Sequence, residues 1–123
     1  MKMSVERLLR EIKNHPEFKK AGMILCHNGV VRNTSRNGRS VTGLTVQVDH
    51  VRLRNIIEQR KRDPGIIEIL VEIQENRRLS VGEDVMYLLV AGDLRENVIR
   101  TLQDTLDAIK STVTQKTESF LTT

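Results

Sequence analysis

Cationic residues at the predicted ends of strands and helices are the side chains best suited to chemistry in this sequence. Arg32 follows the apolar, β-branched run 23–31, and Arg95 falls in the first turn of a long predicted helix. A helix N-terminus presents free N–H groups and the positive end of its dipole, so Arg95 and the backbone can hold a phosphate together. Lys110 lies near the other end of that helix. A partly desolvated lysine there can act as a nucleophile or proton-transfer group, whereas a solvated one only complements the helix dipole.

Other catalytic and metal-binding motifs do not occur in the sequence. His15, His27 and His50 have no regular ligand spacing, and a single cysteine cannot form a CxxC zinc site or an intramolecular disulfide. Cys26 lies within an apolar run, where we expect an inert, buried thiol. There is no glycine-rich nucleotide motif and no GxSxG. We therefore expect neither a metal nor a cofactor.

The positive charge is concentrated in one region. The chain carries a net charge of +4, while residues 32–62 hold eight cations against Asp49 and Glu58, which is +6 and leaves about −2 for the remainder. Such a region suits nucleic acid, a phosphorylated small molecule or an acidic protein partner, although it is also compatible with a plain solvated face. Only three aromatic residues and no Trp are present, which disfavours a base-stacking surface and hence nucleic acid.

The hydrophobic pattern predicts the elements that must position these residues. Helices are expected at 4–14, 50–62 and 94–113, and strands at 23–31, 41–48, 66–73 and 85–91. Asn37-Gly38 is typical of a hairpin turn. The order α, β-β-α, β-β-α predicts an α+β fold, a two-layer sandwich with helices on one side of a mixed or mostly antiparallel sheet. The polar, Thr-rich residues 114–123 are expected to form a loose tail.

Length and composition favour one cytoplasmic domain. The 123 residues suit a single domain over 1–123. No apolar run reaches the roughly 20 residues needed to cross a bilayer, and the N-terminal residues alternate in charge instead of forming an apolar signal segment. We therefore expect no membrane association.

Several motifs, taken in order, resemble a known family. Gly29-Val30-Val31-Arg32-Asn33, with the polar loop and the 41–48 strand after it, resembles the start of the large, catalytic subunit of molybdopterin synthase. Leu79-Ser80-Val81-Gly82-Glu83-Asp84 resembles that family's Leu-x-x-Gly-acidic segment, and Asp107-Ala108-Ile109-Lys110 falls at its catalytic lysine. The likeness covers roughly residues 20 to 113 and implies the family's α/β-hammerhead type of fold.

The resemblance also implies an activity and its residues. The family takes sulfur from a thiocarboxylate at the Gly-Gly end of a small ubiquitin-like subunit and converts a cyclic pyranopterin phosphate to molybdopterin. It implies a homodimer with one small subunit on each half. Arg32, Arg39 and Arg95 would bind the phosphate or the incoming tail. Lys110 would engage the thiocarboxylate-derived carbonyl or move a proton, with Lys116 as a second catalytic lysine.

Three departures leave the activity open. Leu94 replaces the histidine of the family's His-Arg pair, and Gln74-Glu75-Asn76-Arg77 replaces its His-Arg-x-Gly segment. Thr117 occupies the place of the second lysine, which Lys116 can supply only through a one-residue shift. The sequence is compatible with an active sulfur-transferring enzyme. The alternative is a non-catalytic homodimeric module that binds a ubiquitin-like tail or an anionic ligand.

Overall fold

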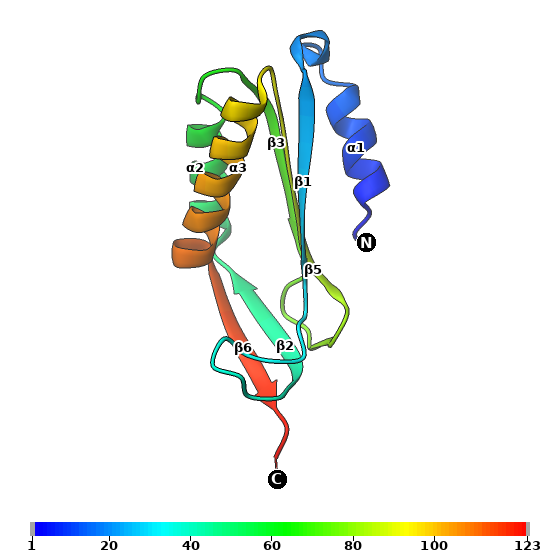
Figure 1. The fold of residues 1–123 in the computed structure, drawn as a ribbon, viewed down its shortest axis with the longest axis vertical. Helices are drawn as coiled ribbons and strands as arrows, with labels where there is room; N and C mark the ends of the chain where they lie inside the picture. The colour runs from blue at the N-terminus through cyan, green and yellow to red at the C-terminus, as the bar shows by residue number, and fades with distance from the viewer. Residues whose placement is uncertain (1, 123) are drawn as a thin grey trace.

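Two three-stranded antiparallel sheets form the framework of the protein in a computed structural model, which describes residues 2–122 (Figure 1). The first sheet has the order β1-β5-β3, and the second has the order β4-β2-β6. The strands are β1 Met23–Val30, β2 Val41–Val48, β3 Ile66–Ile73, β4 Leu79–Ser80, β5 Asp84–Gly92 and β6 Thr114–Phe120. The predicted α+β class with antiparallel pairing is confirmed.

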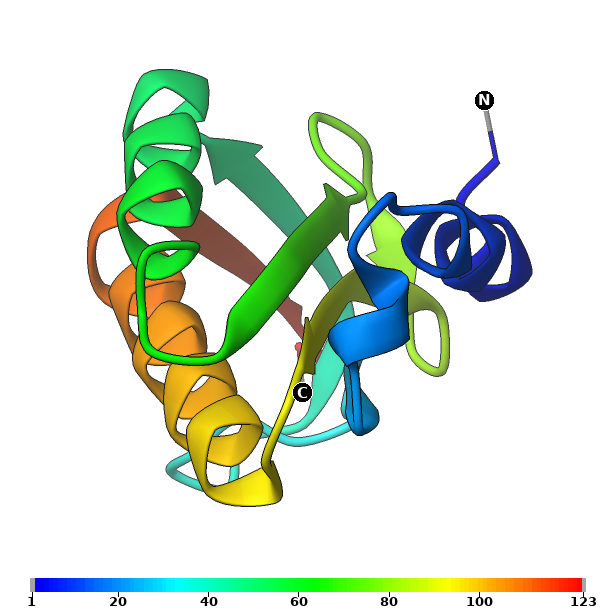
Figure 2. The ribbon, with the colours of Figure 1, turned by 90° about the horizontal axis from the view of Figure 1, so that it is seen from above.

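Helices cover both faces of the first sheet (Figure 2). Alternate residues of the central strand β5 point to opposite faces, so Leu88 and Val90 lie in one apolar core while Leu89 and Ala91 lie in another. Helices α2 His50–Arg60 and α3 Arg95–Ala108 cover the first core, and α1 Val5–Lys13 covers the second. The prediction of helices on one side is therefore wrong for α1.

Helix α1 is fixed to the sheet by a cap, two apolar residues and an ion pair. The Ser4 hydroxyl accepts a hydrogen bond from the Arg7 backbone N–H and begins the helix. Leu8 and Ile12 are buried against β5, and Arg7 forms an ion pair with Glu72 on β3. A short 3₁₀ turn, η1 Phe18–Lys20, leads from this helix to β1. None of the helices within residues 2–122 is long and apolar enough to cross a membrane.

The segment between β1 and β2 is a loop between two sheets. Gly38 has φ +86°, and the isolated bridge between Thr34 and Ser40 closes a small turn around it. However, β1 pairs with β5 and β2 pairs with β6, so the flanking strands do not form a hairpin. The Asn37-Gly38 signal is local, and the apolar faces of the strands decide their partners.

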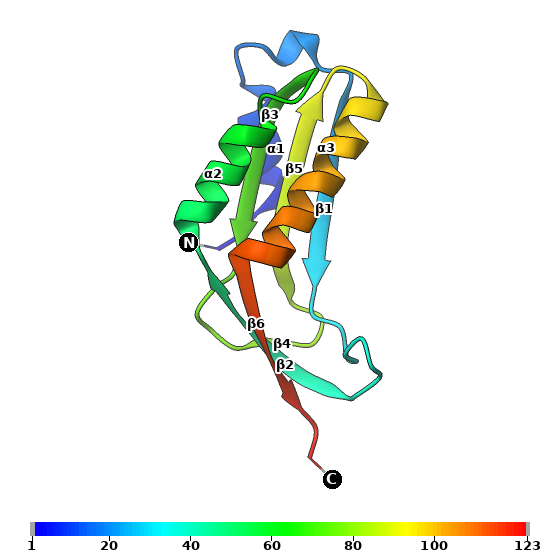
Figure 3. The ribbon, with the colours of Figure 1, turned by 90° about the vertical axis from the view of Figure 1, so that its left-hand side faces the viewer.

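The expected loose tail is the edge strand β6 (Figure 3). After α3 the chain makes a π-helical turn, η2 Ile109–Val113, and then pairs antiparallel with β2 from Val48↔Thr114 to Val41↔Phe120. The prediction of a loose tail is wrong for 114–120, while residue 123 lies outside the described residues. Main-chain hydrogen bonds and the β propensity of Thr hold this polar segment, neither of which gives a hydrophobic pattern.

Candidate functional site

A cavity of about 970 Å³ lies where the two sheets meet. Residues 27–32 of β1 and its following loop form one wall, and β2 and β6 form another. The η2 turn closes the end nearest to α3 through Ile109 and Lys110. The fold therefore brings together an early strand, the last strand and the end of the last helix.

The charges that line this cavity are mostly positive. Its lining includes Arg32, Arg36, Lys110 and Lys116, against the single carboxylate of Glu118. Apolar residues of β2 and β5, such as Val46 and Met86, form the remaining floor. Little water screens cations that lie over an apolar floor, so the positive potential inside the cavity stays strong. The cavity is therefore suited to an anionic ligand.

Strand alternation places Lys116, and not Thr117, in the cavity. Thr114, Lys116, Glu118 and Phe120 all line it, and successive residues of a strand point to opposite faces. The Lys116 side chain keeps access to solvent, but the cavity walls displace part of its hydration. This desolvation lowers the pKa of Lys116, and the charges of Lys110 and Arg36 lower it further while Glu118 opposes them. Lys116 therefore releases its proton more readily than a surface lysine.

Lys110 reaches the same cavity from the other side of the helix-to-strand junction. The neighbouring Ile109 is fully buried and fixes the η2 turn against the core. Lys110 follows it and lines the cavity. Two lysines from separate elements thus line one cationic space, and the catalytic roles that the resemblance implies for Lys110 and Lys116 stay predictions.

Arg32 and Arg39 lie in the loop beside this space. The Arg32 Nε donates to the Thr34 carbonyl oxygen at 2.9 Å, which holds the side chain along the cavity wall. Arg39 does not line the cavity. Its guanidinium lies 3.7 Å from the centroid of the Phe120 ring, and that ring is part of the wall.

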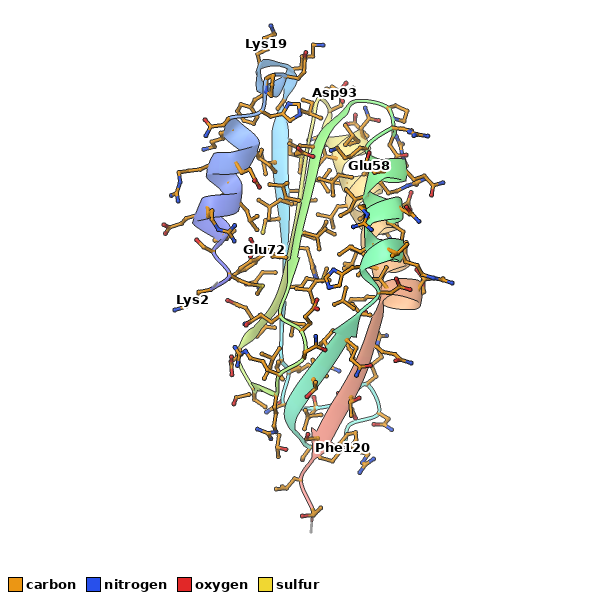
Figure 4. All side chains as sticks on the ribbon, turned by 180° about the vertical axis from the view of Figure 1, so that it is seen from behind. Lys2, Lys19, Glu58, Glu72, Asp93 and Phe120 are labelled. Atoms are coloured by element: carbon orange, nitrogen blue, oxygen red, sulfur yellow. The ribbon has the colours of Figure 1, made fainter. Side chains whose placement is uncertain are left out.

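Arg95 lies at the opposite end of the molecule. Figure 4 shows Asp93, two residues before it, at one end of the long axis and Phe120 at the other. Arg95 is exposed and its Nε lies 3.5 Å from Glu96. The Asp93 carboxylate already accepts the Leu94 N–H at 2.6 Å at this helix start, which opposes a bound phosphate. The expected convergence of Arg95 with the other cations is therefore not found within one chain.

The basic stretch 32–62 divides into two groups. The arginines of the loop lie around the cavity, whereas three cations of α2 and its end form ion pairs. Arg52 lies 3.6 Å from Asp49, and Lys61 lies 3.0 Å from Glu68. Arg60 is placed between Asp63 and Asp104 at 3.5 and 3.7 Å. Much of the charge on α2 is thus compensated, which argues against a nucleic-acid surface.

His27 also lines the cavity, although its sequence motifs indicate no role for it there. The alternation of side chains along β1 could have pointed to this residue. It places His27 on the same face as Met23 and Leu25, which pack against the first core. Partial burial lowers the pKa of His27, and the charges of Lys110 and Lys116 add to this.

Cys26 points to the other face of β1 and is exposed, so the expectation of a buried thiol is wrong. Strand β1 is at the edge of its sheet, and α1 packs against β5 and β3 instead. Partial desolvation raises the pKa of Cys26, so its thiol is a poor nucleophile. Within residues 2–122, no group of three or more His, Cys, Asp or Glu side chains is arranged to hold a metal ion.

The protein thus has an α+β fold with a cationic cavity between its two sheets. The chain belongs to the MoaE protein family, whose model matches residues 1–112. Family membership confirms the resemblance to the large subunit of molybdopterin synthase and supports a role in molybdenum cofactor biosynthesis. A comparison with curated proteins gives no match.

Solved structures share the fold at low sequence identity. Molybdopterin synthase from Staphylococcus aureus superposes with a TM-score of 0.78 at 19% identity, covering 98% of this chain and 88% of that one. Molybdopterin cofactor biosynthesis protein E from Burkholderia multivorans gives 0.76 at 17% identity, covering 98% and 85%. The complex of subunits 1 and 2 of molybdopterin-converting factor from Helicobacter pylori gives 0.71 at 15% identity, covering 96% and 80%.

Proposed function

We propose that this protein is the large-subunit component of a cytoplasmic molybdopterin synthase. It would transfer sulfur from the thiocarboxylate of a small ubiquitin-like subunit, ending in Gly-Gly, to a cyclic pyranopterin phosphate. The observation that carries the proposal is that Lys110 and Lys116 share one cationic cavity. Family membership supports the same reaction class.

The proposed chemistry exchanges sulfur for oxygen. A thiocarboxylate sulfur bonds to a substrate carbon and an oxygen leaves that carbon, after which water replaces the carbon–sulfur bond of the small subunit with a carbon–oxygen bond and releases a carboxylate. A dithiolene contains two sulfur atoms, so this exchange takes place twice and consumes two thiocarboxylates. No net oxidation or reduction is needed. The substrate oxygen that leaves needs a proton donor. The water that releases the acyl group needs a proton acceptor.

The cavity offers residues for these steps. Arg32 and Arg36 would hold the phosphate or the incoming tail, because guanidinium groups bind such anions through paired N–H donors. Lys110 would stabilise charge that develops on the acyl oxygen. Lys116, with its lowered pKa, would exchange protons with the reacting groups. Arg39 would act indirectly, by holding Phe120 in the wall.

The proposed assembly is a homodimer with one small subunit on each protomer. The Helicobacter pylori structure is titled as a complex of two subunits, which supports a small partner here. Arg95 is too far from the cavity of its own chain, so any role in anion binding requires the cavity of a second copy. Sedimentation of the protein with and without a small subunit tests the stoichiometry.

Reconstitution tests the activity. The protein is mixed with a thiocarboxylated small subunit and the pterin precursor, and dithiolene product is measured. Lys110→Ala and Lys116→Ala should each abolish most product, while Lys19→Ala, at the far end of the molecule (Figure 4), should not change it. The double substitution Lys116→Thr with Thr117→Lys moves the amine to the other strand face and should also be inactive. Product formation by Lys110→Ala equal to that of the unaltered protein would contradict the proposed site.

The alternative function is a non-catalytic module that keeps the cavity for a tail or another anion. The replacement of a family histidine by the exposed Leu94 favours it. A tail-binding module would bind the small subunit without making product, whereas failure to bind any such subunit contradicts both the synthase and the tail-binding module.

A further inference from the structure

His27 is a third ionisable side chain in the cavity that contains Lys110 and Lys116. It lies half-buried on β1, paired with Leu88 of β5. Gly29, two residues further, is on the same face of the strand, and a Cβ built there would lie 3.5 Å from the His27 Nε2. The ring therefore extends along Gly29, and both residues line the cavity.

The protein groups around His27 are, on balance, unfavourable to a positive charge. The η2 turn contributes Lys110, β6 contributes Lys116 and Glu118, and the loop after β1 contributes Arg32 and Arg36. Strands β2, β3 and β5 present apolar side chains to the cavity. Burial and the two lysines lower the pKa of His27, so its imidazole is neutral at neutral pH when no anion is bound.

We propose that His27 takes up a proton from solvent when an anion binds in the cavity, and that the imidazolium then binds this anion beside Lys110 and Lys116. An anion reverses the local field, because its negative charge offsets the lysines that oppose protonation. The identity of the physiological anion rests on the proposed function, but the protonation step does not. His27 is thus a binding residue that becomes cationic only when the cavity is occupied.

Linkage fixes the direction of the pH dependence. An anion that favours protonated His27 raises the pKa of this residue, and protonated His27 binds the anion more tightly. The affinity is therefore highest at low pH and falls as the pH rises through the range between the pKa of the free and the occupied states. A rise of about one unit in this pKa corresponds to roughly a tenfold gain in affinity.

Sulfate is the probe of choice because its own charge does not change between pH 5 and 8. The imidazole signals of the full chain are followed by NMR during pH titrations with and without saturating sulfate. The His27 signal should titrate below 6.5 without sulfate and at a higher pH with it. His15 and His50 contact Glu68 and Glu75 away from the cavity, so their signals are internal controls that should not respond to sulfate.

Two variants separate protonation from shape. His27→Phe retains a ring and His27→Gln retains polarity, and neither can take up the proton. For a rise of about one unit in the pKa of His27, the unaltered protein should bind sulfate about fivefold more tightly at pH 5.5 than at pH 7.5, and both variants should lose most of this difference. Circular dichroism verifies that the variants are folded.

Three results would overturn the inference. These are a His27 titration that sulfate does not move, a pH dependence of sulfate affinity that survives both substitutions, and no binding of sulfate at either pH. None of these measurements uses a small subunit or a pterin. A failure of the sulfur-transfer assay alone therefore counts against the proposed function and leaves the proton uptake by His27 intact.

Discussion

The guanidinium carbon of Arg39 lies 3.7 Å above the centroid of the Phe120 ring. This cation–π contact joins the loop after β1 to the end of β6, and the same ring forms part of the cavity wall. Two segments that are far apart in the sequence are thereby held together beside the candidate site.

Removing either partner of this contact should cost a small amount of stability. Arg39→Gln and Phe120→Leu should each lower the free energy of unfolding, with about 0.5–1 kcal/mol of the loss coming from the shared contact. In a double-mutant cycle measured by urea unfolding, the double variant should lose less than the sum of the two single losses. Strict additivity would show that the contact contributes nothing.

The pKa of Lys116 should respond in opposite directions to its two charged neighbours. Burial lowers this pKa first, Lys110 lowers it further, and Glu118 raises it. Lys110→Met should therefore move the pKa of Lys116 upward toward its ordinary value of 10.5, and Glu118→Gln should move it further down. NMR titration of ¹³C-labelled lysine side chains measures both. Shifts of the same sign in the two variants would contradict the arrangement of the cavity.

Tyr87 should stabilise the protein through the carboxylate of Asp84. The Tyr87 hydroxyl donates to Asp84 Oδ2 at 2.6 Å, and this bond, with a second from Asn28, lowers the pKa of Asp84. A lowered carboxyl pKa adds stability above the ordinary value of 3.8, and this is lost as the pH falls through the folded-state pKa. Tyr87→Phe should cost about 1 kcal/mol near pH 7 and less at pH 3. A cost that does not change with pH would exclude Asp84 as the cause.

Gly65 should tolerate a side chain less well than Gly82 does. Its φ is +76°, and a Cβ there would lie 2.0 Å from Asp93 Oδ1. Gly82 has φ +90° and open space around it, so it is a matched control for the backbone conformation alone. Gly82→Ala should cost about 1 kcal/mol, and Gly65→Ala should cost more because Asp93 must move. Equal melting temperatures for the two variants would contradict the close approach.

The apolar pattern of the sequence predicts most elements but not their partners. The runs 41–48 and 66–73 are strands with the predicted bounds, because β-branched residues and turn signals mark both ends. Strand pairing depends on contacts between distant segments, so β1 and β2 lie in different sheets despite the Asn37-Gly38 turn. The strand β6 was missed because its stability comes from backbone pairing with β2 and not from apolar side chains.

For the candidate site, too, the sequence indicates individual residues but not which of them lie together. Arg32 and Lys110 were singled out by their positions at the ends of elements and Lys116 only by the family resemblance, and all three line the cavity. Arg95 also lies at an end of a helix, but at the end of α3 opposite to Lys110. The full length of α3 therefore separates the two residues. The choice of Lys116 over Thr117 needed the register of β6, which fixes the face that each side chain occupies.

The candidate site depends on the edge strand β6, whose local free energy of opening is lower than that of the first sheet. Within the described residues it packs mainly on β2 and the η2 turn, while the β1-β5-β3 sheet is held by cores on both faces. A polar edge strand opens with a lower free energy than a buried sheet, and opening removes Lys116 from the cavity. Backbone amides of β6 should therefore exchange with solvent far sooner than those of β5, and mild denaturant should open β6 before the β1-β5-β3 sheet unfolds.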